Sequence, residues 1–425
     1  VRIKGDYDFY LAHEGNGPLC LPTKDDLSYL QYSSGSTRFP HGVAVTHNSL
    51  MVNTHGMSFH GVGVNETDRC VSWLPFYHDM GLVGTLLTAI TAQMSVDFIP
   101  TEEFARRPLS WLRVMSQNKG TITYSPTFGF DICARRAALR SGALDDLDLS
   151  SVRVAGVGAE MIRPDVLRDF INTFSPIGFS EKAFLPSYGM AECTLGVSFG
   201  EVGKGFEIDY VEEAQLTGGR MLVAGGSDSR TREVVNCGKP LPDFEIEVRD
   251  EDDTVLPEGR VGRVFLRGAS VMREYFNDPE TTREVLSSEG WLDTGDMGYM
   301  KAGCIYIVGR AKDMIIVNGR NHWPQAIEWA AEQMDGIKVG DVAAISVPGE
   351  NNEEVPMLLA QCRLSDTAER ARFSDNLKKH VQRETGIICM IELVPPRALP
   401  RTSSGKLSRS KARQQYLSGR LRATG

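Results

Sequence analysis

Short apolar segments alternate with longer helical stretches through the first two thirds of the chain. The apolar segments are rich in β-branched and aromatic residues, a composition that predicts strands. These predicted strands are Asp26–Tyr32, Arg69–Leu74, Thr121–Ser125, Val152–Val157 and Ala183–Leu185. A helix is predicted from Thr46 onward, and the weakly polar run Gly81–Ala92 predicts a buried helix. The pattern indicates an α/β architecture in which the loops after the strands carry ligands.

The pattern changes to β-rich hairpins from about Phe244. β-Branched and aromatic residues recur in Phe244–Asp250, Gly262–Gly268 and Gly303–Arg310, with turn-forming residues between them. We therefore predict one large domain over residues 1–310, with a β-rich subdomain from about residue 238. Three further elements predict a small α+β domain over residues 311–425. They are the helix Pro324–Met334, the strand Val342–Val347 and the helix Ala368–Glu384.

Composition narrows the possible classes of protein. The 425 residues, 41% of them hydrophobic, suffice for more than one core. A net charge of -9 argues against a surface that binds nucleic acid or anionic membrane, and no apolar run is long enough for a membrane span. The eight cysteines form no Cys-x-x-Cys pair, which indicates reduced thiols and a cytoplasmic location. No signal peptide is recognisable, and because Val1 is not an initiator methionine we expect the large domain to be truncated at its start.

A loop rich in hydroxyls and glycine follows the first predicted strand. Its backbone N–H and side-chain O–H donors suit an oxygen-rich anion such as a phosphate. The loop residues are Ser33, Ser34, Gly35, Ser36 and Thr37. A solvated turn is the alternative interpretation, because the loop lacks the lysine of the Walker pattern.

Further segments follow this loop in a fixed order. They are Trp73–Leu82, Pro186–Glu192, Trp291–Asp296, Gly309–Asp313 and Ser403–Lys406. Together they resemble the core motifs of the adenylate-forming superfamily. The stretches WLPFYHDMGLVG, from Trp73, and IVNGRNHWPQAIE, from Ile316, resemble the fatty-acyl-AMP ligase branch more than CoA ligases. The long spacing between Thr194 and Gly238 is similar to an insertion in that branch.

The resemblance implies both a fold and a nucleotide site. The fold is a large adenylate-forming N-terminal domain, truncated at its start, joined by a hinge near Lys312 to a small mobile α+β C-terminal domain. Ser33, Ser34, Gly35, Ser36 and Thr37 would hold the phosphates of ATP. Tyr188 would stack on adenine, Asp296 would accept hydrogen bonds from the ribose hydroxyls, and Arg310 would add charged donors. The other residues expected to bind ATP or AMP are Gly158, Ala159, Glu160, Ser187, Gly189, Met190 and Ala191.

Three residues carry the chemistry that the resemblance implies. Glu192 would hold Mg²⁺, unless it is only an acid at a helix N-terminus. His78 would lie near the substrate carboxylate and the α-phosphate, with a satisfied core histidine as the alternative. Lys406 would stabilise the charge that develops on the α-phosphate and pyrophosphate. Its alternative is a solvated lysine in a basic tail, since no acidic residue follows Glu392.

The phosphate loop departs from the superfamily pattern. His41 stands where a lysine is common, and an unperturbed imidazole is mostly neutral at pH 7. Arg38 would compensate for the lost charge.

The implied function is ATP-dependent activation of a fatty acid to acyl-AMP, with release of pyrophosphate. The acyl group would then pass to the phosphopantetheine thiol of an acyl carrier protein or polyketide synthase domain, whose acidic surface the basic tail would attract. One alternative is a fatty acyl-CoA ligase. Another is a catalytically silent adenylate-binding protein, which the altered phosphate loop motivates. The fatty acid would occupy an apolar tunnel shaped by residues such as Trp73, Phe128 and Met190.

Overall fold

The computed structural model describes residues 21–33, 40–139, 142, 144–216, 222, 230–317, 320–349, 354–402 and 405–421. Four predicted phosphate-binding residues, Ser34, Gly35, Ser36 and Thr37, lie outside these ranges, as does Arg38. Of the predicted phosphate-loop residues, Ser33 is therefore the one that can be placed.

A seven-stranded sheet forms the centre of the N-terminal part. Its order is β11-β8-β7-β6-β5-β3-β4, and the strands from β7 to β4 are parallel. The strands are β3 (Arg69–Ser72), β4 (Ser95–Phe98), β5 (Ile122–Ser125), β6 (Val154–Val157), β7 (Phe184–Gly189), β8 (Gly196–Phe199) and β11 (Lys239–Pro240). Four of the five predicted strands are thus confirmed within this sheet. The fifth, β1 (Leu27–Tyr32), instead pairs antiparallel with β2 (Gly42–Thr46) in a separate ribbon.

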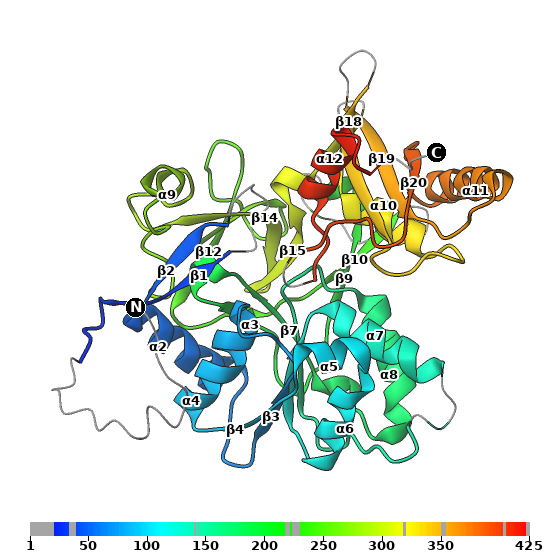
Figure 1. Ribbon diagram of the computed structural model, residues 1–425. Coiled ribbons are helices and arrows are strands. Elements are labelled where there is room, and N and C mark those ends of the chain that lie inside the picture. The colour runs from blue at the N-terminus through cyan, green and yellow to red at the C-terminus, as the bar shows by residue number, and fades with distance from the viewer. Residues whose placement is uncertain are drawn as a thin grey trace, which may run out of the picture.

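Helices pack around this sheet in two groups (Figure 1). They are α2 (His47–His55), α3 (Asp79–Gly81), α4 (Thr88–Ala92), α5 (Thr101–Arg106), α6 (Leu109–Gln117), α7 (Thr127–Ala138) and α8 (Pro164–Phe174). The predicted helix Gly81–Ala92 is confirmed, although its middle is the π-helix Leu82–Leu87 and Ile90 is exposed. A second π-helix, Gly56–Gly61, continues α2. Since π-helical turns are often found at functional sites, both are candidate parts of a binding site.

Large aromatic side chains fill the core between the sheet and α6–α8. Phe130, Phe170 and Phe184 are fully buried and their rings meet at 5.0–5.9 Å. Trp111 is also fully buried, and its indole N–H donates to Thr123 Oγ1 of β5 at 2.9 Å. Because its polar atom has a partner, this tryptophan stabilises the core without a desolvation penalty.

The β-rich part is a four-stranded antiparallel sheet with a small ribbon beside it. Its elements are β12 (Phe244–Arg249), β13 (Gly262–Gly268), β14 (Leu292–Lys301) and β15 (Cys304–Arg310), with α9 (Pro279–Val285) between β13 and β14. The ribbon pairs β9 (Ile208–Glu212) with β10 (Thr231–Val235). The β14–β15 register places Asp296 opposite Arg310, so two predicted site residues are brought together by strand pairing.

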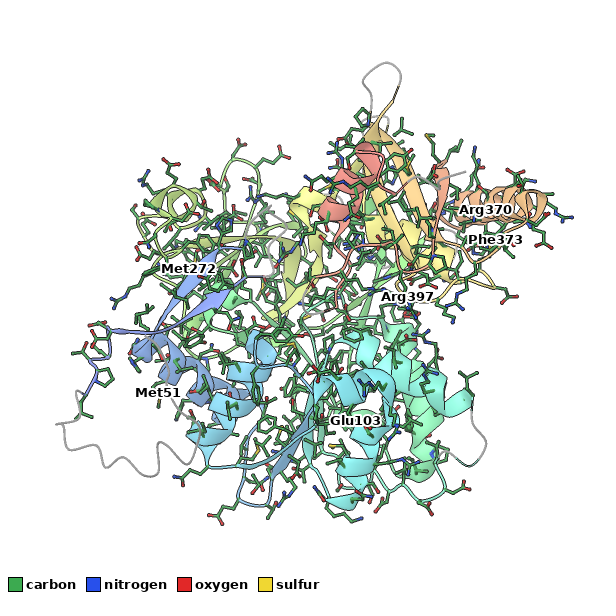
Figure 2. The ribbon with its side chains drawn as sticks, viewed as in Figure 1. Met51, Glu103, Met272, Arg370, Phe373 and Arg397 are labelled. Carbon is green, nitrogen blue, oxygen red and sulfur yellow. The ribbon has the colours of Figure 1, made fainter. Side chains whose placement is uncertain are left out.

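The C-terminal part has its own sheet, with order β18-β19-β20. Its elements are β16 (Ile315–Val317), β17 (Arg320–His322), α10 (Pro324–Glu332), β18 (Val342–Pro348), β19 (Glu354–Gln361), α11 (Thr367–Thr385), β20 (Met390–Val394) and α12 (Arg409–Leu417). The predicted helices and strand are confirmed. Ile327, Leu358 and Leu377 belong to a hydrophobic cluster distinct from that of the large sheet, and Phe373 of α11, labelled in Figure 2, packs against it. Across the described ranges, none of the helices combines the length and apolar character needed to cross a bilayer.

A buried charge network ties α12 to the rest of the C-terminal part. Arg409 donates from Nε and Nη2 to both oxygens of Glu328 at 2.7 and 2.6 Å, and from Nη1 to Asp313 at 3.0 Å. Glu328 is only 5% exposed and also accepts from the Ala344 N–H at 2.9 Å. Removal of the guanidinium would therefore leave a buried carboxylate without its partner.

We expect Arg409→Met to destabilise the protein by about 3–5 kcal/mol, the usual cost of breaking a buried ion pair. The free energy of unfolding, measured by urea denaturation with circular dichroism, tests this expectation. Arg413→Met on the same helix is the matched control, since Arg413 is exposed and bonds the Ser346 carbonyl. Equal losses in the two variants would contradict the assigned role of the network.

Candidate active site

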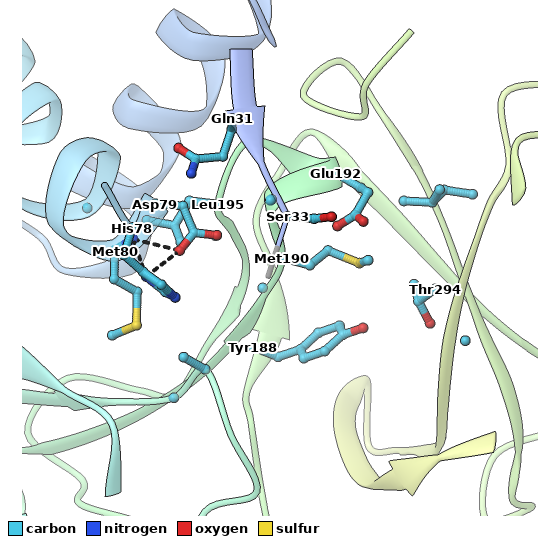
Figure 3. A pocket seen from close by; sticks show the side chains of 18 of the residues that line it. Gln31, Ser33, His78, Asp79, Met80, Tyr188, Met190, Glu192, Leu195 and Thr294 are labelled. Atoms are coloured by element: carbon cyan, nitrogen blue, oxygen red, sulfur yellow. Dashed lines mark hydrogen bonds and ion pairs between the residues drawn. The ribbon is translucent and has the colours of Figure 1, made fainter. Parts of the chain in front are cut away.

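All described site residues predicted from the sequence line one of two adjoining cavities. The larger cavity has a volume of about 670 Å³. Its predicted lining residues are Ser33, His78, Gly158, Ala159, Ser187, Tyr188, Gly189, Met190, Ala191, Glu192, Arg310, Lys312 and Lys406. The smaller cavity, of about 350 Å³, shares several of these and adds Glu160 and Asp296. Figure 3 shows Tyr188, Met190, Glu192 and His78 around the same space.

Asp296 is the centre of a polar cluster where the two cavities meet. It is 6% exposed, and it accepts hydrogen bonds from Tyr188 Oη at 2.7 Å and from Arg310 Nε at 3.1 Å. The charge of Asp296 outweighs burial and raises the pKa of Arg310 above its usual value. Burial together with Asp296 likewise raises the pKa of Tyr188, so both groups remain protonated donors. Each carboxylate oxygen retains a lone pair for a further donor.

The loop after β6 lies tightly against the end of β7. A side chain at Gly158 would meet the Ser187 carbonyl at 2.6 Å, so glycine is required there. Ala159 has a φ of 68°, a left-handed conformation that is uncommon for alanine. Glu160 accepts from the Phe128 N–H at 3.0 Å, and burial raises the pKa of its carboxyl group. These contacts hold the Gly158–Glu160 loop beside Tyr188, where we expect the planar adenine base to bind.

His78 and Asp79 lie at the start of α3, facing the larger cavity. His78 Nδ1 is 2.7 Å from Asp79 Oδ1. Burial alone would raise the pKa of Asp79, but the hydrogen bond and charge of His78 and the charge of Lys406 lower it below its usual value. Asp79 was not among the predicted site residues. Its position directly after a candidate histidine was the available signal, because a neighbouring carboxylate commonly orients an imidazole.

A tight turn delivers Lys406 to both cavities. Thr402 N–H donates to the Lys406 carbonyl at 2.8 Å, and Gly405 has a φ of 86°, which favours glycine. Burial lowers the pKa of the Lys406 ammonium, while the charges of Asp79 and Glu160 act in the opposite direction. None of the described residues forms an ion pair with this ammonium. Its charge is therefore available to an anion in the cavity.

Glu192 lies on the turn between β7 and β8. Its Oε1 accepts from Tyr275 Oη at 2.8 Å, and burial raises the pKa of its carboxyl group. In the part of the chain that the structure describes, no group of three or more His, Cys, Asp or Glu residues could hold a metal ion by itself. A lone carboxylate fits Mg²⁺, because this ion usually binds one or two carboxylates together with phosphate oxygens and water.

The β1–β2 ribbon holds the two ends of the predicted phosphate loop. The Ser33 N–H donates to the His41 carbonyl at 2.9 Å. His41 Nδ1 lies 3.0 Å from Asp278 Oδ2, so the residue that replaces the common lysine is paired with a carboxylate. Ser33 lines the larger cavity close to this closure.

The far end of the larger cavity is apolar. It is lined by Met57, Val62, Met80, Gly84, Leu195, Gly196 and Phe199, partly from the two π-helices. A side chain at Gly196 would meet Met57 Sδ and the Phe199 ring at 2.8–2.9 Å. Of the residues expected to shape the tunnel, Met190 lines this cavity and Phe128 lines the smaller one. Trp73 stacks on Phe104, with ring centroids 3.7 Å apart, and lines neither cavity.

Comparisons with known proteins identify the family to which the chain is similar. Residues 8–276 match the family model described as AMP-binding enzyme. A Caulobacter vibrioides protein named as an acyl-CoA synthetase is 47% identical over 96% of this chain and 71% of its own length. The long-chain-fatty-acid–AMP ligase of Mycolicibacterium smegmatis is 33% identical over 95% of this chain and 70% of its own.

Solved structures of fatty acyl-adenylate ligases are similar to this chain in fold and sequence. A structure from a study of fatty acyl-adenylate ligases of E. coli and L. pneumophila has a TM-score of 0.90 at 43% identity. It aligns with 97% of this chain, which covers 73% of that chain. The L. pneumophila fatty acyl-adenylate ligase solved with acyl adenylate and pyrophosphate has a TM-score of 0.67 at 31% identity, over 93% of this chain and 71% of that one.

Proposed function

The chain belongs to the AMP-binding enzyme family, in its fatty-acyl-AMP ligase branch, and from this premise we propose that it activates a fatty acid with ATP. The products would be acyl-AMP and pyrophosphate. The observation that carries the proposal is the meeting of Tyr188, Asp296, Glu192 and Lys406 around cavities whose far end is apolar. These four polar groups suit a nucleotide with its metal ion, and the apolar end suits an alkyl chain.

In the proposed reaction, a carboxylate oxygen of the fatty acid attacks the α-phosphorus of ATP. The new P–O bond forms as the bond to pyrophosphate breaks, and no proton needs to move. Negative charge grows on the non-bridging oxygens, which the Lys406 ammonium stabilises. Asp296 and Arg310 fix the ribose, and His78, oriented by Asp79, donates to the reacting carboxylate or phosphate.

Glu192 is the residue that we propose for Mg²⁺. The ion would neutralise phosphate charge when it is bound with ATP. The contribution of the chain is to hold the Glu192 carboxylate in a fixed position. Because the substrate is ATP, we assign the reaction to the cytoplasm.

The small C-terminal domain, residues 311–425, would turn about a hinge near Lys312 between two working orientations. We assign the described arrangement, with Lys406 in the cavity, to acyl-AMP formation. Two kinds of contact hold this arrangement. Arg163 forms an ion pair with Glu332, and the guanidinium groups of Arg163 and Arg232 lie 5.6 and 5.4 Å from the centroid of the Trp329 ring. These contacts would have to break before the second orientation, in which the acyl group passes to a thiol.

For the acceptor thiol we propose the phosphopantetheine arm of an acyl carrier protein or polyketide synthase domain. Fatty acyl-CoA ligase activity is the second candidate, favoured by the name of the Caulobacter relative. Parallel assays with a holo carrier protein and with free CoA distinguish them. Efficient acyl-CoA formation without transfer to the carrier would reject the first candidate.

The apolar end of the larger cavity, which would hold the acyl chain, gives a further prediction. Phe199 is 8% exposed and is a bulky apolar residue in the lining of the cavity, so Phe199→Leu should admit a longer chain. Each additional methylene that becomes buried contributes about 0.8 kcal/mol, or roughly fourfold in kcat/KM. Competition between fatty acids of increasing length, with acyl-AMP products quantified by mass spectrometry, measures the shift.

Phe98→Leu is the control for this series, because Phe98 packs on Phe76 at the surface and lines neither cavity. An unchanged chain-length profile in Phe199→Leu would show that Phe199 does not limit the length of the acyl chain.

A further inference from the structure

The Glu192 carboxylate is held by a segment far from it in the sequence. Tyr275, 83 residues away, donates from Oη to Glu192 Oε1 at 2.8 Å, and Tyr275 is only 7% exposed. The Met272 N–H donates to the Glu192 carbonyl at 2.7 Å. The segment around Met272 and Tyr275 thus fixes both the backbone and the side chain of Glu192.

The same segment is anchored to the β1–β2 ribbon. Val43 and Tyr275 form a β-bridge, and the Phe276 N–H donates to the Gly42 carbonyl at 2.7 Å. Tyr275 therefore contacts both Glu192 and β2, the strand that follows the predicted phosphate loop in the sequence.

His41 contacts both Tyr275 and the residue before α9, Asp278. Its ring centroid lies 5.0 Å from that of Tyr275, and its Nδ1 lies 3.0 Å from Asp278 Oδ2. The Tyr275 N–H donates to Thr282 Oγ1 at 2.9 Å, at the start of α9. The tyrosine ring is therefore packed on one side by the residue that closes the loop, while its hydroxyl faces the carboxylate.

A carboxylate that holds Mg²⁺ benefits from such a donor. Rotation about its side-chain torsions would otherwise disperse the oxygen positions, and a hydrogen bond to one oxygen leaves the other oriented for the ion. Residues that orient metal ligands in this way typically change metal affinity by 10–100-fold when they are replaced.

We propose that Tyr275 is a positioning residue for the metal carboxylate Glu192 and couples it to the end of the phosphate loop. The inference rests on the proposed function, since it requires a nucleotide-bound metal at Glu192. Tyr275 lies outside the motifs predicted from the sequence.

Tyr275→Phe tests the inference, because it keeps the ring against His41 and removes the hydroxyl. We expect Mn²⁺ to bind about 10–100-fold more weakly in the presence of a non-hydrolysable ATP analogue, measured by electron paramagnetic resonance. The Mg²⁺ concentration for half-maximal acyl-AMP formation should rise by a similar factor. High Mg²⁺ should restore kcat, with an unchanged KM for the fatty acid.

Tyr299→Phe is the matched control. Tyr299 is also buried and donates to a carboxylate, Asp209 Oδ2 at 2.9 Å, but it lies outside both cavities. Thr282→Val, which removes the acceptor of the Tyr275 N–H, gives a second variant if Tyr275→Phe does not fold. It should weaken Mn²⁺ binding in the same direction by a smaller factor.

Two results would overturn the inference while leaving the proposed function intact. One is unchanged Mn²⁺ affinity in both Tyr275→Phe and Thr282→Val when the wild-type chain forms acyl-AMP. The other is a loss of kcat that does not depend on Mg²⁺, which indicates a general structural role. A wild-type chain that binds Mn²⁺·nucleotide but forms no acyl-AMP would instead reject the proposed function.

Discussion

Lys406→Ala is expected to slow acyl-AMP formation by roughly 10²–10³-fold, equivalent to about 2.7–4 kcal/mol of transition-state stabilisation. The ammonium lines both cavities and forms no ion pair with a described residue, so its charge is available to the phosphates. Replacing it removes a charge that interacts more strongly with the transition state than with bound ATP. The loss should therefore appear mainly in kcat.

Pyrophosphate release with a mixture of fatty acids measures this step. Lys411→Ala is the matched control, because Lys411 lies exposed on the neighbouring helix α12. Transfer from chemically prepared acyl-AMP to a carrier protein should be nearly unaffected in Lys406→Ala. If wild type and Lys406→Ala release pyrophosphate equally slowly with every fatty acid, the chain is a catalytically silent adenylate-binding protein.

Asp296→Asn is expected to lower kcat/KM for ATP by roughly 30–150-fold, or about 2–3 kcal/mol. The carboxylate accepts from Tyr188 and Arg310 at once. An amide has only one acceptor oxygen, so its NH₂ group would face one of these two donors. Arg310 would also lose its charge partner in a buried setting, which adds to the loss.

Initial rates at varied ATP and fatty acid separate the two substrates. The KM for the fatty acid should change little, since Asp296 lines the smaller cavity whereas the apolar residues line the larger one. Asp252→Asn, in an exposed turn, is the control. A variant with normal kcat/KM for ATP would contradict the assignment of Asp296 to the ribose.

Most elements of the fold could be predicted because their signals are local. Parallel strands buried by helices, such as β5 and β6, are short apolar runs, and α11 is recognisable from its length and its Gly386 end. The position of β1 was less evident. Only residues 33–41 separate it from β2, fewer than a parallel crossover requires, and this spacing favours the antiparallel ribbon.

The site could be predicted only where its residues lie within short motifs. Tyr188, Glu192 and Lys406 were each identified from neighbouring residues, and the fold brings them together. Tyr275 carries no such signal, because its contact with Glu192 depends on the packing of β2 against a distant segment. Trp73 lines neither cavity and Phe199 lines the larger one for the same reason: which aromatic ring faces a cavity depends on packing between elements.

The contacts of Arg163 with Glu332 and Trp329 affect how long each step of the proposed cycle takes. Every turnover would have to open this buried junction once to hand over the acyl group and close it again for the next ATP. A firmer junction would keep Lys406 in place longer and delay handover, whereas a looser one would speed handover and leave fewer molecules ready for chemistry. The throughput of the enzyme should therefore peak at an intermediate strength of this junction.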